Sequence, residues 1–159
     1  MKYDWTKFTM RIPIEKNKSD VFKTWSSQKG IESWFLRKAL YFDNGKQIPA
    51  NQEIKKGNTF RWNWYMNKYT EDGTILDVKK DQLVSFTFVG SVVTVKLKSQ
   101  GKFTFVELTQ DHIPLDEESK VQIHLGCSTG WTYHLTNLKS MLENRKDLRN
   151  KKFKKVFNN

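Results

Sequence analysis

The chain has 159 residues, which suits a single domain with a substantial buried core. Its 28 Lys and Arg residues against 17 Asp and Glu give a formal net charge of +11. No apolar run approaches the roughly 20 residues of a transmembrane helix, the N-terminus does not resemble a secretory signal, and the single cysteine excludes an internal disulfide framework. We therefore expect a soluble, cytoplasmic protein.

The positive charge is concentrated near the C-terminus. Residues 139–159 hold eight Lys or Arg and two Asp or Glu, which is more than half of the net charge. Apolar side chains interrupt the basic run at Leu148, Phe153, Val156 and Phe157. Such a segment could contact an anionic membrane or nucleic acid. A solvated end is the simpler interpretation. No known nucleic-acid module is present, and we expect no such partner. We place the domain at residues 1–147 and a basic tail at 148–159.

The first third of the chain predicts one strand followed by two short helices. Residues 5–14 alternate between apolar and polar side chains, which is typical of a half-buried strand. Ser19 is a candidate N-cap for a first helix, and residues 31–35 predict a second. A strand is expected near 36–42, before a polar loop.

The middle of the chain predicts an antiparallel sheet. Strand patterns cover 59–65, 73–80, 82–90, 91–99 and 102–110. The connections are too short for crossover helices, so neighbouring strands should pair antiparallel. Strict alternation would place one set of aromatic side chains on a common face: Trp62, Trp64, Phe86, Phe88, Phe103 and Phe105.

A long C-terminal helix should cover that face. Asp116 is a plausible N-cap, and the helix is expected from about residue 119 to 146. At 100° per residue, Trp131, Leu135 and Leu138 form one apolar stripe, with His134 at its edge. The predicted fold is therefore α+β: a curved antiparallel sheet wrapped around a long C-terminal helix, with two short helices after the first strand.

Gly130 and Trp131 place the smallest and the largest side chain together inside this helix. A helix-interior glycine costs about 1 kcal/mol relative to alanine, so its presence needs a reason. Without a side chain, Gly130 would let a ligand or another backbone approach the helix, and Trp131 would line the adjacent space. An apolar cavity is one interpretation, and a solid aromatic core is the other.

The sequence resembles the bacterial homologues of the activator of heat-shock-protein-90 ATPase, within the START-like (SRPBCC, Bet v 1-like) superfamily. The resemblance spans about residues 5–145, and the Gly130-Trp131 pair followed by NLKSMLE is its most specific part. The Trp34-Phe35 pair gives weaker support. The resemblance implies a helix-grip fold with a deep hydrophobic cavity between sheet and helix. Members of the superfamily bind hydrophobic molecules, assist a chaperone or act as cyclases.

Candidate chemistry on the helix is limited. His124 and His134 are ten residues apart, roughly 15 Å along the axis, so one metal ion cannot join them and no metal or cofactor is expected. Cys127 with His124 could form a nucleophile pair, although a buried cysteine is more often inert. His134 could move protons in a cavity enzyme or could orient a ligand.

Three functions remain open at this stage. The first is binding of a hydrophobic small molecule, lipid-like or polyketide-like, with His134 as a polar anchor. The second is regulation of a chaperone ATPase through the surface of the protein. The third is cyclase-type catalysis in the cavity. The sequence does not decide whether the protein is an enzyme or which oligomeric state it has. The expected ligand-binding residues are Trp62, Trp64, Phe86, Phe88, Phe103, Phe105, Trp131, His134, Leu135 and Leu138.

Overall fold

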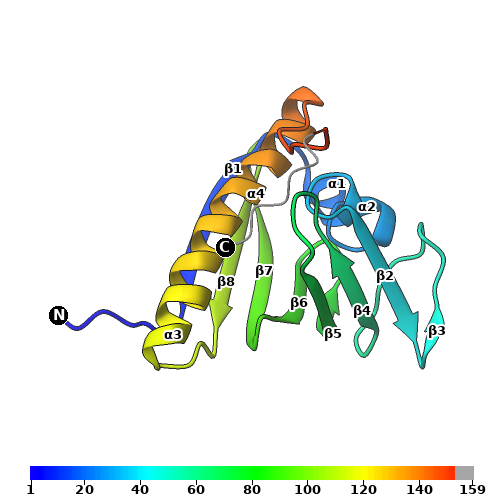
Figure 1. The fold of residues 1–159 in the computed structure, drawn as a ribbon. Helices are drawn as coiled ribbons and strands as arrows, with labels where there is room; N and C mark the ends of the chain where they lie inside the picture. Colours follow the sequence, from blue (N-terminus) through cyan, green and yellow to red (C-terminus); the bar gives the residue numbers. More distant parts are fainter. Residues whose placement is uncertain (153–159) are drawn as a thin grey trace.

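A computed structural model describes residues 1–152 and shows one eight-stranded antiparallel sheet (Figure 1). The strands are β1 (Phe8–Ile14), β2 (Lys38–Asp43), β3 (Lys46–Gln47), β4 (Thr59–Asn63), β5 (Thr70–Lys79), β6 (Leu83–Phe88), β7 (Ser91–Gln100) and β8 (Phe103–Asp111). Their order in the sheet is β1-β8-β7-β6-β5-β4-β2-β3. The expected meander is confirmed from β4 to β8, and β1 closes the sheet beside β8.

Two short helices carry the chain from β1 at one edge to β2 near the other. Helix α1 (Lys18–Lys23) and helix α2 (Gln28–Glu32) lie between these strands in sequence. The prediction that Ser19 caps the first helix was wrong, because Ser19 lies inside the first turn of α1. Asn17 has an extended backbone and its side chain accepts the Asp20 N–H at 2.8 Å.

The C-terminal helix consists of three segments. It begins with α3 (Glu117–Ser119), continues through the π-helical turn η1 (Lys120–Leu125), and ends as α4 (Gly126–Asn144). The predicted cap Asp116 is confirmed, since its side chain accepts the Ser119 N–H at 2.8 Å. Figure 1 shows the helix lying over the β1–β8 side of the sheet.

The π-helical turn binds the N-terminal segment through His124. The imidazole Nδ1 lies 3.1 Å from the Trp5 carbonyl oxygen, and Nε2 lies 2.8 Å from the Tyr3 hydroxyl. Because a carbonyl can only accept, Nδ1 donates and Nε2 accepts from Tyr3. His124 is therefore occupied by the N-terminal segment.

The core lies between one face of the sheet and the helices. Trp62 and Phe86 face it, as alternation predicted, and Leu135 and Leu138 of α4 are buried opposite them. The core is aromatic: the Trp62 ring centroid lies 4.0 Å from that of Phe60 and 5.1 Å from that of Phe86.

Strand β8 corrects the prediction for Phe103 and Phe105. Both lie on the outer face and are half-buried, whereas Thr104, Val106 and Gln110 point into the core. The apolar pattern of this strand changes parity in its middle, and a regular strand can bury only one parity. The fold buries the set that includes two polar residues, and the Thr104 hydroxyl is satisfied by donating to the Lys16 carbonyl at 2.7 Å.

The contacts of the domain continue past residue 147, where the sequence placed its end. Arg149 is only 9% exposed and bonds to the backbone of the segment that joins α2 to β2. The tail residues Phe153, Val156 and Phe157 lie outside the described residues.

Candidate functional site

Trp131 of α4 lies at the centre of the aromatic core with its orientation fixed by a hydrogen-bond chain. Its indole Nε1 donates to Gln110 Oε1 at 2.9 Å, and Gln110 Nε2 donates to Ser91 Oγ at 2.7 Å. Ser91 in turn donates to the Phe88 carbonyl at 2.6 Å. The ring of Trp131 stacks on Phe35, with centroids 4.9 Å apart. A buried polar network in which each member is satisfied holds its residues in one arrangement.

Gly130 faces open space. An ideal Cβ built at Gly130 would meet no atom within 4 Å, and one at Gly126 would meet only the Val121 carbonyl, at 3.5 Å. Protein packing therefore does not require glycine at either position. The two glycines are four residues apart and so lie on the same side of α4.

The space beside these glycines is a cavity of about 230 Å³. Its walls come from α4, from the α2–β2 connection, from the segment between β4 and β5, and from the end of β6. We call it the first cavity. Its lining residues are Phe35, Trp64, Asn67, Tyr69, Phe88, Val89, Gly126, Cys127, Gly130, Trp131 and His134.

A buried carboxylate, that of Glu71, lies behind two lining residues of the first cavity. Tyr69 donates its hydroxyl hydrogen to Glu71, and the other Glu71 oxygen accepts the Val89 N–H at 2.7 Å. Val89 has a positive φ of 47°, which is unusual for a β-branched residue, and Glu71 holds its backbone in place. Burial, followed by the hydrogen bond to Glu71, raises the pKa of Tyr69, so the phenol stays protonated.

Two titratable side chains of α4 line the first cavity and are neutral near pH 7. Burial raises the pKa of the Cys127 thiol, against a hydrogen bond with Gln110 that lowers it. Burial and then the charge of Arg149 lower the pKa of His134 to about 4. His134 Nδ1 is buried without a hydrogen-bond partner among the described residues, and the ring lies between Phe35 and Tyr133.

A second cavity of about 310 Å³ adjoins the first. The two share Phe35, Trp64, Asn67 and His134, which we call the shared wall. The second cavity is completed by Tyr65, Met66, Tyr133, Arg149 and Asn150.

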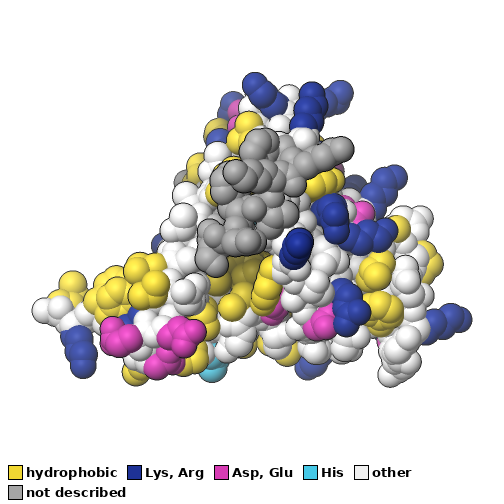
Figure 2. All heavy atoms as spheres, in the orientation of Figure 1, with side chains coloured by type: hydrophobic (Ala, Val, Ile, Leu, Met, Phe, Trp, Pro, Cys, Tyr) yellow, Lys and Arg dark blue, Asp and Glu magenta, His cyan; other side chains and the backbone are white. Residues whose placement is uncertain are grey.

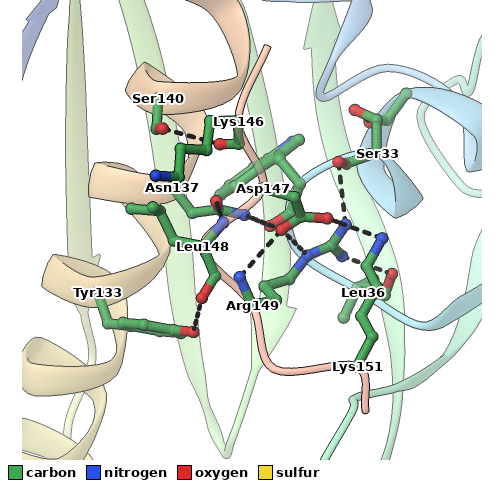
Figure 3. Close-up of polar contacts among 12 residues, drawn as sticks. Ser33, Leu36, Tyr133, Asn137, Ser140, Lys146, Asp147, Leu148, Arg149 and Lys151 are labelled. Carbon is green, nitrogen blue, oxygen red and sulfur yellow. Dashed lines mark hydrogen bonds and ion pairs between the residues drawn. The ribbon is translucent and has the colours of Figure 1, made fainter. Parts of the chain in front are cut away.

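The segment after α4 shapes the second cavity (Figure 3). Arg149 binds Asp147 through Nε at 2.9 Å and Nη2 at 2.8 Å. It also donates to the carbonyls of Leu36 and Ser33, at 3.0 Å each. Asn137 of α4 receives the Leu148 N–H at 2.7 Å, so this segment is bound to both the helix and the α2–β2 connection.

The expected site residues divide into three groups. Trp64, Phe88, Trp131 and His134 line the first cavity. Those buried in the core outside that lining are Trp62, Phe86, Leu135 and Leu138. Phe103 and Phe105 lie on the opposite face of the sheet.

Sequence reasoning missed several residues of the site. The lining residues Tyr69, Val89 and Asn67 come from loops and strand ends, which carry no periodic signal. Phe35 was detectable only as part of the Trp34-Phe35 pair. Arg149 lies in a basic run whose composition indicates a solvated tail, so the sequence did not predict its place in the second cavity.

Residues 1–152 hold neither a cluster of metal-ligand side chains nor a membrane-spanning helix. No group of three His, Cys, Asp or Glu side chains there is placed to hold a metal ion. No helix of that part of the chain is long and apolar enough to span a membrane.

A curved antiparallel sheet closed over a long C-terminal helix defines the helix-grip class of proteins. Residues 16–143 match the family model described as activator of Hsp90 ATPase homolog 1-like protein, and this chain belongs to that family. No curated protein matches the chain.

Solved structures share the fold at low sequence identity. A protein from Staphylococcus saprophyticus is 20% identical with a TM-score of 0.72, over 90% of this chain and 96% of that one. The Aha1 dimer of Colwellia psychrerythraea is 17% identical with a TM-score of 0.68, over 88% and 98%. DynU16, described as a putative protein in the dynemicin biosynthetic locus, is 14% identical with a TM-score of 0.68, over 91% of this chain and 50% of that one.

Proposed function

We propose that the protein binds a hydrophobic small molecule in the first cavity. The observation that carries the proposal is the open space at Gly130. Glycine destabilises a helix interior, and no protein atom fills the space beside Gly130. A bound small molecule in that space best explains why glycine stands there. The flat walls of Trp64, Phe88 and Trp131 suit an apolar or aromatic ligand.

The polar groups of the cavity favour binding over catalysis. A general acid or base works best with a pKa near the operating pH. His134, with a pKa of about 4, is almost fully deprotonated at pH 7 and is a poor proton donor. As a neutral ring it can still exchange a hydrogen bond with a ligand, which is the role of polar anchor. DynU16, described as a putative protein in the dynemicin biosynthetic locus, supports a polyketide-like ligand by analogy of fold alone.

Regulation of a chaperone ATPase, which the family description names, is the second candidate. That activity would use the outer surface, so filling the cavity should leave it unchanged. Cavity binding and surface regulation are therefore separable by one substitution.

The test is titration with the neutral fluorescent probe N-phenyl-1-naphthylamine. Wild-type protein should bind it and increase its emission. Gly130→Leu places a side chain in the cavity, with its Cβ more than 4 Å from the protein atoms around it, and should weaken binding at least tenfold. The matched control is Thr129→Leu, which adds an apolar side chain of the same size to the exposed side of α4 and should bind as the wild type does. Absence of probe binding by the wild type, or equal affinity in the wild type and Gly130→Leu, would overturn the proposal.

A further inference from the structure

The two cavities are neighbours that share four lining residues, and His134 of α4 is one of them. The first cavity lies below the roughly 300–1,000 Å³ of typical ligand pockets, and the second lies near the lower limit. The four shared residues place the two next to each other along α4. The first cavity lies against Gly126 and Gly130, and the second lies against Tyr133, nearer the C-terminal end of the helix. An elongated molecule in the first cavity would therefore extend past His134 into the second.

The two ends of this path carry opposite charge. Behind the first cavity, the Glu71 carboxylate accepts hydrogen bonds from Tyr69 and Val89, and its charge adds to the larger effect of burial in raising the pKa of Cys127. Beside the second cavity, the positive charge of Arg149 is felt at His134 and lowers the pKa of that ring. Both effects are exerted on residues that line the path itself.

A second cation adds to the positive end. The Arg149 guanidinium carbon and the Lys151 ammonium lie 5.4 and 5.5 Å from the centroid of the Tyr65 ring, which lines the second cavity. Asp147 forms ion pairs with both cations, at 2.8 and 2.7 Å, so the group of three retains one net positive charge. Asp147 does not itself line the second cavity, and the lining residues within 1–152 include no acid.

Arg149 is also built as a buried donor. Its side chain is 4% exposed, and its position is fixed by Asp147 and by the Leu36 and Ser33 carbonyls. These contacts use four of its five N–H groups within the described chain, which leaves one at Nη1. Figure 2 shows that Lys and Arg side chains gather where α4 ends, whereas Asp and Glu side chains lie over α3, at the other end of the C-terminal helix.

We propose that the ligand is an elongated amphiphile with a carboxylate at one end, whose apolar body fills the first cavity and whose carboxylate lies in the second cavity beside Arg149. This inference rests on the proposed function and adds the chemical class and the orientation of the ligand. The reverse orientation would place the carboxylate beside Glu71, where like charges repel in a poorly solvated site.

The test compares decanoate with 1-decanol, which share a ten-carbon chain and differ in the charge of the end group. Each is used, at monomeric concentrations and pH 7.4, to displace N-phenyl-1-naphthylamine. Wild-type protein should bind decanoate at least tenfold more tightly than 1-decanol. Arg149→Met should reduce that preference to threefold or less while the neutral probe still binds.

Two further variants control for misfolding of Arg149→Met and for a general effect of removing positive charge. Lys151→Gln removes the second cation and should reduce the preference by a smaller factor, even if Arg149→Met fails to fold. Lys98→Gln removes one exposed cation from the outer side of β7 and should leave the preference unchanged.

The outcomes separate the two proposals. No binding of the probe by wild-type protein would overturn the proposed function. If the probe binds but decanoate and 1-decanol displace it equally well, the proposed function stands and the proposal that the ligand carries a carboxylate is overturned. A preference for decanoate that survives in both Arg149→Met and Lys151→Gln would overturn the assigned position of the carboxylate.

Discussion

Trp131 of α4 donates its indole hydrogen to Gln110 of β8, and this bond joins the long helix to the sheet in the middle of the core. Gln110 is fully buried and bonds onward to Ser91, so one side chain satisfies two buried partners. The wall of the first cavity formed by Trp131 is therefore held by polar contacts as well as by packing.

Replacing Gln110 with leucine should destabilise the protein and disturb the cavity. The substitution leaves the Trp131 N–H buried without an acceptor, which costs about 1–3 kcal/mol. Urea unfolding should show this loss, and N-phenyl-1-naphthylamine should bind more weakly because the indole loses its fixed orientation. Gln100→Leu, at the exposed end of β7, serves as control. Equal unfolding midpoints for the two variants would show that the bond contributes nothing.

Asn137 should be the most sensitive polar residue of α4. Its amide donates to the Trp34 carbonyl at 2.6 Å and receives the Leu148 N–H at 2.7 Å, in a fully buried position. Asn137→Ala removes these two contacts and a third hydrogen bond, to Asp147 Oδ1 at 3.2 Å, and should lower the free energy of unfolding by about 2–4 kcal/mol. Asn144→Ala, at the exposed end of the same helix, should change it by less than about 0.5 kcal/mol. Comparable losses in the two variants would contradict the assignment.

His134 should make stability depend on pH between about 4 and 6.5. Its folded-state pKa is lowered from 6.5 to about 4, so in this window the unfolded chain binds more protons than the folded one. Stability therefore rises with pH through the window and its His134 contribution is complete above pH 6.5. This difference in pKa corresponds to about 3 kcal/mol of unfolding free energy. The charged group that acts on the ring is Arg149.

The measurement is urea unfolding of wild type and His134→Gln from pH 4 to 7.5. The difference between their unfolding free energies should change across the window, while contributions from carboxylates cancel. Histidine NMR signals give the pKa directly. A His134 titration near pH 6.5 would show that the ring is solvated and would remove this prediction.

Cys127 should react slowly with iodoacetamide in the folded protein. Its thiol is half-buried with a raised pKa, so little thiolate is present at pH 8. We expect the alkylation rate, followed by mass spectrometry, to be at least tenfold lower than in urea-unfolded protein. Bound N-phenyl-1-naphthylamine should lower it further, because Cys127 lines the first cavity. A rate unaffected by the probe would place the probe elsewhere.

The sequence predicted the strands and the face of most core residues because alternation is a local property. Trp62, Phe86 and Trp131 all face the core as their spacing indicated. Phe103 and Phe105 were misplaced because the side-chain pattern of β8 supports either face. The choice was made by polar partners from elsewhere in the chain: Lys16 for Thr104, and Ser91 and Trp131 for Gln110.

The π-helical turn and the segment after α4 were also beyond local reasoning. A helical wheel drawn at 100° per residue does not include the extra residue of a π-helical turn. The contact of His124 in that turn is with Trp5, more than a hundred positions away in the sequence. Arg149 reads as one more basic residue in a charged run until its contacts with Ser33 and Leu36 are known.

Local pattern thus determined the secondary structure, the fold class and the presence of an unexplained glycine beside Trp131, because all three depend on residues close together in the chain. Tertiary structure decided that the space at Gly130 is open, that a second cavity adjoins the first, and that Glu71 bonds to the lining of the first while Arg149 lines the second. A cavity is the volume left by side chains from several elements, and its electric field sums charges distant in sequence. Neither quantity exists until those elements have packed together.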